Sequence, residues 1–181
     1  MPPDHLFLIG YRGSGKSSVG RALAAILHRA WIDTDERIAG RAGMPIRDLF
    51  AQRGEADFRS LESSIIADLA LDPPAVVSLG GGAILRPENR DCLRRLGSTV
   101  WLRAPVELLS ARIAADEAAG KTRPSLTGSG AADEVARVLT EREPLYASAA
   151  DWTLEIEGAT PDDRARRIAD WYAQALRSRE S

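Results

Sequence analysis

The stretch Gly10-Tyr11-Arg12-Gly13-Ser14-Gly15-Lys16-Ser17 follows directly on the apolar run 6–9. It matches G-x-x-x-x-G-K-[ST], a loop whose successive backbone N–H groups form a nest for phosphate at the start of a helix. The glycines let the backbone approach an anion without a Cβ in the way. Lys16 can reach the β- and γ-phosphates, and the Ser17 hydroxyl can ligate Mg²⁺. The motif predicts binding of a nucleoside triphosphate by Gly10, Gly13, Ser14, Gly15, Lys16, Ser17 and Ser18.

The chain around this loop alternates between short apolar runs and segments of helical periodicity. Strands are expected at 6–9, 30–33, 75–79, 99–102 and 152–156. Helices are expected from the loop to about 28, before a break at 40–43, from Pro45 to a closing Gly54, and over 55–71, 87–96, 105–119, 133–146 and from 161 onward. Apolar strands separated by helices are typical of an α/β protein with a parallel sheet covered on both faces. We expect a five-stranded sheet in a single domain, 1–181.

Composition excludes several classes of protein. The 181 residues carry a net charge of −2, which argues against a nucleic-acid-binding surface. Cys92 is the only cysteine, so an internal disulfide is impossible and a thiolate zinc site is not expected. The first residues lack the basic segment of a signal peptide, and no apolar window reaches the length of a membrane span. The sequence therefore predicts a cytoplasmic protein with no membrane partner.

Two carboxylates follow the second expected strand, in the triplet Asp33-Thr34-Asp35. One interpretation is an N-cap pair for the next helix. The other is functional, because the carboxyl ends of parallel strands meet at one edge of the sheet, where the P-loop also lies. A triphosphate needs Mg²⁺, and an acceptor hydroxyl needs a carboxylate to take its proton. Since the run 76–79 ends in no acid, Asp33 with Ser17 is the candidate for the metal, and Asp35 for the acceptor.

A run of three glycines ends the third expected strand, in Ser78-Leu79-Gly80-Gly81-Gly82-Ala83. Three glycines cost backbone entropy and make room for a ligand against the main chain, which a plain turn does not require. On the helix before this strand, Arg59 of Phe58-Arg59 lies three residues before Glu62, which can hold its guanidinium in place. From the residues alone, that pair also fits a solvated surface contact.

The segment 120–132 loses all periodicity and is rich in Gly, Ser and Thr, which is typical of a functional or disordered loop. Two further short motifs are Arg123-Pro124, within this segment, and Arg142-Glu143-Pro144-Leu145-Tyr146, after it. With the motifs above, in this order and spacing, the chain resembles the shikimate kinase family from about Leu6 to Tyr172. Only the P-loop is specific by itself, but the combination is distinctive.

The resemblance implies a P-loop kinase fold with the P-loop strand in the centre of the sheet and a mobile lid at about 116–132. It implies transfer of the ATP γ-phosphate, with Mg²⁺, to the 3-hydroxyl of shikimate, in the pathway to aromatic amino acids. Separately from the resemblance, we expect a monomer. Asp35, in an acceptor-binding region at about 33–62, would bind acceptor hydroxyls and act as base. The carboxylate of shikimate would be bound by Arg59, Arg142, Gly80, Gly81 and Gly82. The residues expected to be catalytic are Lys16, Asp35 and the lid residue Arg123, which would also bind nucleotide.

Two stretches depart from the family pattern. The lid usually reads Asn-Arg-Pro-Leu, whereas this chain has Thr122-Arg123-Pro124-Ser125-Leu126. The loop after the last strand often offers a basic residue near adenine, but 157–161 offers none, which leaves Arg112 as the candidate for stacking on the base.

Two alternatives differ in function. The first is another small-molecule P-loop kinase, such as a gluconate-type or nucleotide kinase. The glycine triplet and paired arginines favour a small anionic polyol over a nucleobase as acceptor. The second is a non-catalytic nucleotide-binding homologue, against which the intact Lys16, Ser17, Asp33, Asp35 and Arg123 argue.

Overall fold

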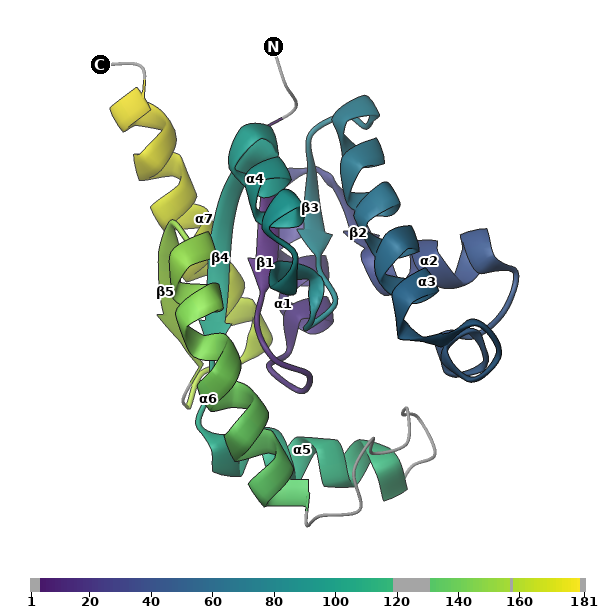
Figure 1. Ribbon diagram of the computed structural model, residues 1–181. Coiled ribbons are helices and arrows are strands. Elements are labelled where there is room, and N and C mark those ends of the chain that lie inside the picture. Colours follow the sequence, from purple (N-terminus) through teal and green to yellow (C-terminus); the bar gives the residue numbers. More distant parts are fainter. Residues whose placement is uncertain (1–3, 119–130, 157, 180–181) are drawn as a thin grey trace.

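One parallel sheet organises the chain, with strand order β2-β3-β1-β4-β5 (Figure 1). The computed structural model describes residues 4–118, 131–156 and 158–179. The strands are β1 (His5–Ile9), β2 (Ala30–Asp33), β3 (Ala75–Ser78), β4 (Gly97–Arg103) and β5 (Trp152–Glu155). The predicted five-stranded α/β fold is confirmed, and the strand that leads into the P-loop is the central one, as the resemblance implied.

Helices cover both faces of this sheet. The helices are α1 (Lys16–Leu27), α2 (Thr34–Ala42), α3 (Ile46–Asp68), α4 (Pro87–Leu96), α5 (Val106–Ala118), α6 (Ala131–Ala149) and α7 (Pro161–Arg179), with 3₁₀ turns η1 (Leu69–Leu71) and η2 (Ala83–Leu85). Helices α1 and α7 pack against each other on one face, and α4 and α6 lie on the other (Figure 1). Helices α2 and α3 pack together beside β2, and α5 packs against α6. No helix in the described ranges is both long and apolar enough to cross a membrane.

The expected break at Gly54 is present, whereas the bounds of α6 and of the lid differ from the sequence-based expectation. Gly54 has non-helical angles, φ 80° and ψ 177°, and divides α3 into two helical segments, which confirms the helix end expected there. Helix α6 begins at Ala131 and continues past Tyr146 to Ala149, with Pro144 inside it. The predicted lid therefore starts and ends inside helices, since 116–118 belong to α5 and 131–132 to α6. The rest of it, with Arg123, lies outside the described residues.

The main core follows the β1 strand, whose residues Leu6, Phe7 and Leu8 are fully buried. His5 begins the same strand and is also fully buried, with both ring nitrogens in hydrogen bonds. Its Nε2 lies 2.8 Å from the Leu69 carbonyl, and the Ala75 N–H donates to its Nδ1 at 3.1 Å. These bonds attach the start of η1 and the start of β3 to the central strand.

A second, smaller apolar cluster joins α2 to α3. It consists of Ile38, Leu49, Phe58 and Ile65, all of them buried. Phe58 packs against Phe50, with ring centroids 4.5 Å apart. Because Arg59 follows Phe58 directly, burying the Phe58 ring in this cluster sets where Arg59 leaves the helix.

Gly97 marks the closest approach between β4 and β1. A Cβ at this position would lie 1.9 Å from the His5 carbonyl oxygen, to which the pairing brings it. We expect Gly97→Ala to destabilise the fold by about 3 kcal/mol or more. The added Cβ would overlap main-chain atoms of His5, which cannot move aside in a close-packed sheet. Urea unfolding would measure the loss. The matched control is Gly40→Ala, where no atom lies within 4 Å of the added Cβ. Equal stabilities for the two variants would contradict this account.

Candidate active site

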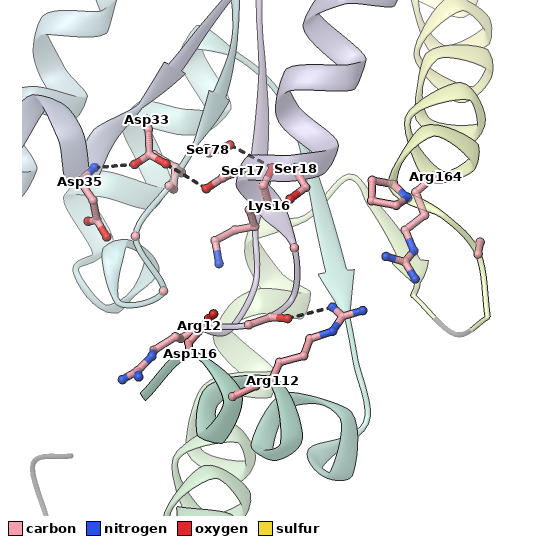
Figure 2. A pocket seen from close by; sticks show the side chains of 18 residues that line it. Arg12, Lys16, Ser17, Ser18, Asp33, Asp35, Ser78, Arg112, Asp116 and Arg164 are labelled. Carbon is pink, nitrogen blue, oxygen red and sulfur yellow. Dashed lines mark hydrogen bonds between the residues drawn. The ribbon is translucent and has the colours of Figure 1, made fainter. Parts of the chain in front are cut away.

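Two cavities meet at the carboxyl edge of the sheet. The larger, about 740 Å³, lies over the P-loop (Figure 2). The smaller, about 240 Å³, lies between the glycine run after β3 and helix α3. Four residues line both cavities: Arg12, Asp35, Gly80 and Gly81. A ligand in one cavity would therefore lie next to a ligand in the other.

The P-loop in the larger cavity has the backbone that its glycines allow. Gly13 and Gly15 have φ of 83° and 88°, in the left-handed region that side chains disfavour. Gly10 has φ 145°, and a Cβ there would lie 2.7 Å from the Leu102 carbonyl oxygen of β4. Helix α1 starts at Lys16, immediately after Gly15, so its unpaired N–H groups face the loop. This arrangement is suited to bind a chain of phosphates.

Lys16 extends from this helix start into the loop. Its Nζ donates to the carbonyls of Gly10 and Tyr11, at 2.8 and 2.9 Å. Burial lowers the pKa of Lys16 to about 8 from its usual 10.5, although the nearby carboxylates of Asp35 and Asp33 raise it. A polyphosphate would add negative charge beside the ammonium and favour its protonated form.

The lowered pKa makes nucleotide affinity depend on pH. The last ionisation of a phosphate group has a pKa near 6 and is nearly complete by about pH 7.5. Between about pH 7.5 and 9.5 the change in ADP affinity therefore reports on Lys16. We expect the Kd for ADP to rise as pH passes 8, by up to about tenfold per pH unit, because the anion binds the protonated lysine. The stability of the free protein changes with pH in the opposite sense to its affinity for ADP. The folded state then binds fewer protons than the unfolded chain between about 8 and 10.5, so stability rises with pH there.

Calorimetric titration of ADP across this range would measure the change. The control is Lys16→Arg, whose guanidinium stays charged throughout. It should bind more weakly and without the rise above pH 8. An equally pH-dependent Kd in this variant would contradict a role for Lys16.

Asp33 is the N-cap that one interpretation of the sequence expected, and it also contacts Ser17. It is the N-cap of α2, and its Oδ1 accepts from the Asp35 N–H at 2.9 Å. Its Oδ2 accepts from the Ser17 hydroxyl at 3.0 Å (Figure 2). The cap therefore places Asp33 beside Ser17 and lets Asp35 extend toward the glycine run.

The ends of β2 and β3 are locked together by Thr34. Its hydroxyl donates to the Ser78 carbonyl at 3.3 Å and accepts from the Gly80 N–H at 3.2 Å. Ser78 in turn donates to the Lys16 carbonyl at 3.2 Å. This buried network sets the acidic triplet, the glycine run and the start of α1 at fixed positions relative to one another.

The glycine run makes room for charged side chains of the smaller cavity. A Cβ on Gly80 would lie 2.8 Å from Oδ1 of Asp35, and a Cβ on Gly82 would lie 2.4 Å from Nη1 of Arg59. Arg59 in turn donates to Glu62 at 2.8 Å. The Glu62 side chain is only 1% exposed and that of Arg59 14%, so the pair is a buried ion pair.

Arg142 reaches the same glycine run from α6. Its Nη1 donates to the Gly81 carbonyl at 3.2 Å, and the Tyr146 hydroxyl donates to the same carbonyl at 2.5 Å. Burial raises the pKa of Tyr146 to about 12, so its hydroxyl remains a donor. Arg59 and Arg142, 83 positions apart in the numbering, both line the smaller cavity.

Arg112 lies at the P-loop, as a nucleotide-side residue should. Its Nη1 donates to the Gly13 carbonyl at 2.9 Å from α5 (Figure 2). The sequence analysis missed two further arginines of the nucleotide cavity, Arg12 and Arg164. Arg12 sits inside the P-loop motif, where its variable position gave no signal. Arg164 falls at a buried position of the otherwise polar first turn of α7, and charge alone marks it as a surface residue.

Comparison with known proteins identifies the family of this chain. The family model for shikimate kinase matches residues 12–173. A shikimate kinase of Nitratidesulfovibrio vulgaris is 53% identical over 145 residues, 80% of this chain and 82% of the relative. One from Rhodopirellula baltica is 40% identical over 161 residues, 89% of this chain and 86% of the relative.

A solved structure shows the same fold. The shikimate kinase of Acinetobacter baumannii in complex with shikimate superposes with a TM-score of 0.88 at 32% identity, over 96% of this chain and 94% of that one. With the P-loop, the acidic triplet and the two arginines placed around two joined cavities, these matches confirm the resemblance: the chain belongs to the shikimate kinase family.

Proposed function

We propose that this enzyme transfers the γ-phosphoryl group of ATP to the 3-hydroxyl of shikimate, forming shikimate 3-phosphate and ADP. The observation that carries the proposal is the position of Asp35, which lines both the P-loop cavity and the acceptor cavity. A group at that junction can face the acceptor hydroxyl and the phosphoryl group together. The described residues thus offer a donor site, an acceptor site and a base between them.

Transfer in this site depends on positioning and charge. The acceptor hydroxyl attacks the γ-phosphorus, its proton passes to the Asp35 carboxylate, and the bond to the β-phosphate oxygen breaks to leave ADP. Lys16 and the backbone N–H groups of the nest stabilise the charge on the transferring group. The lid residue Arg123, outside the described residues, is proposed to add a further positive charge.

The acceptor cavity is suited to a carboxylate. We propose that Arg59 and Arg142 bind the carboxylate of shikimate from two sides, with the glycine backbone alongside. A guanidinium can meet two carboxylate oxygens at once, which an ammonium cannot. Glu62 holds Arg59 in the orientation that this contact needs.

The residues present also fit Mg²⁺. The described chain holds no group of three or more acidic, His or Cys side chains that could form a metal cage. Mg²⁺ at a nucleotide does not need one, since phosphates and water supply most of its oxygen ligands. We propose Ser17 as a direct ligand and Asp33 as a partner through water, because their oxygens already lie 3.0 Å apart. The ion would neutralise charge on the β- and γ-phosphates.

Other expectations from the sequence stay part of the proposal. They are a monomer that acts in the cytoplasm, one domain over 1–181, an acceptor region at about 33–62 and a lid at about 116–132.

An acceptor panel tests the proposal. With ATP and Mg²⁺, shikimate should yield one ADP per phosphorylated acceptor, measured by coupled ADP release and ³¹P NMR of the product. A neutral carboxamide analogue should lose about 30-fold or more in kcat/KM, because the buried arginines then lack their charged partner. Better use of gluconate would favour the gluconate-type alternative, and ADP release without phosphorylated acceptor would favour an impaired homologue.

Two variants should mimic the loss of the carboxylate. Arg59→Lys removes the planar fork, and Gly82→Ala displaces it, since the Cβ would overlap the Arg59 guanidinium. Both should raise the KM for shikimate by about tenfold or more and leave the KM for ATP nearly unchanged. They should discriminate little against the amide. The control is Arg53→Lys, exposed on the same helix. An amide that binds unmutated enzyme as well as the acid would overturn the assignment.

A further inference from the structure

A buried arginine in the nucleotide cavity has no role in the chemistry described above. Arg164 is only 4% exposed, yet it lines the cavity with Ala159 and Pro161. Its Nη2 donates to the Ile156 carbonyl at 2.6 Å, and its Nε has no hydrogen-bond partner. In the described part of the chain, no carboxylate forms an ion pair with it. Burying an arginine under these conditions is costly unless something compensates.

The start of α7 fixes the backbone from which the Arg164 side chain extends. Thr160 and Asp163 form reciprocal hydrogen bonds, from the Asp163 N–H to the Thr160 hydroxyl at 3.2 Å and from the Thr160 N–H to the Asp163 carboxylate at 3.3 Å. The Arg164 N–H then donates to the Thr160 carbonyl at 3.1 Å. The backbone of Arg164 is therefore fixed in the first turn of the helix, next to the cavity wall.

A second arginine approaches the same region from α5. Burial is the main cause that lowers the pKa of Arg164, and the positive charge of nearby Arg112 lowers it further. Figure 2 shows the two guanidinium groups coming from different helices on the side of Lys16 away from Asp35. Because the terminal phosphoryl group must face Asp35, the base of the nucleotide belongs on this other side.

We propose that Arg164 is a specificity residue for the donor nucleotide, which donates hydrogen bonds to the acceptor edge of a purine base. A guanidinium offers only donors. Adenine presents N7 as acceptor on that edge, beside an amino group, whereas guanine presents both N7 and O6. Arg164 thus favours purine N7 and permits guanine nucleotides as phosphoryl donors. The inference rests on the proposed use of ATP, and it supplies the basic residue for the base that the sequence 157–161 lacks.

Equilibrium binding without acceptor tests this separately from catalysis. Calorimetry would compare ADP, GDP and 7-deaza-ADP, which lacks the N7 acceptor, on the unmutated protein and on Arg164→Met. The unmutated protein should bind GDP within about tenfold of ADP and should lose about 10- to 100-fold with 7-deaza-ADP, the effect of one charged hydrogen bond. The variant should bind ADP and 7-deaza-ADP alike, and should lose more affinity for GDP than for ADP.

The matched control is Arg167→Met, which removes an exposed charge from the same helix. It should leave all three affinities unchanged. Thermal unfolding without nucleotide separates a structural role: on this proposal, Arg164→Met keeps or raises the melting temperature, because a buried charge is removed. The proposal is overturned if 7-deaza-ADP binds the unmutated protein as well as ADP does, or if the variant weakens every nucleotide equally. If binding follows the proposal while no acceptor is phosphorylated, only the proposed function fails.

Discussion

Lys16→Ala is expected to abolish measurable turnover, a loss of at least about 10³-fold. The Lys16 ammonium is expected to contact the transferring phosphoryl group, and this chemistry depends on such fixed positive charges. In the free protein its Nζ already lies within 2.9 Å of two P-loop carbonyls, so it also braces the loop. Steady-state kinetics with saturating ATP and shikimate would measure the loss.

Binding of ADP to this variant should weaken but persist. The backbone nest around Gly13 and Gly15 and the start of α1 remain, and they bind phosphate without the side chain. Arg21→Ala is the control, since it removes an exposed cation from the same helix. If Lys16→Ala retained full activity, the site would not be a P-loop kinase site.

Asp35→Asn is expected to keep the fold and nucleotide binding while lowering kcat by about 10²- to 10⁴-fold. The amide can still form a hydrogen bond to the acceptor hydroxyl but is a poor proton acceptor. It also removes a charge that raises the pKa of Lys16. The rise of the ADP Kd with pH should therefore begin at lower pH in this variant, so kinetics are best compared near pH 7.

Glu36→Gln provides the control, because it neutralises the adjacent, exposed carboxylate on the same helix. It should change neither kcat nor either KM by more than about twofold, as surface charges contribute little. A rise in the KM for shikimate alone, with kcat unchanged in Asp35→Asn, would show that Asp35 orients the acceptor and that another group accepts the proton.

Local features of the site could be predicted because neighbouring residues encode them. The P-loop needs glycine at Gly13 and Gly15 for its left-handed backbone, and this requirement is visible in the sequence itself. Strands and helices show in the hydrophobic period, so five parallel strands could be expected. The boundaries were less certain where a helix tolerates a breaker, as α6 does at Pro144.

Arg59 is a residue whose environment could not be predicted from its neighbours in the sequence. Spacing alone could not distinguish a surface pair from a buried one. The packing of Phe58 and the missing Cβ of Gly82 put the guanidinium inside the acceptor cavity. The same holds for Arg164, whose burial depends on how α7 packs against the rest of the fold.

By itself, the sequence determined the phosphate loop, the alternation of strands and helices, and the residue types of a small-molecule kinase. Only the tertiary structure decided which of them meet. The order β2-β3-β1 sets Asp33 opposite Ser78 and Ser78 opposite Leu8, which brings three strand ends to one edge. Backbone conformation depends on nearby residues, whereas contacts across 60 or more positions, such as Arg142 with Gly81, arise only when hydrophobic burial packs the helices onto the sheet.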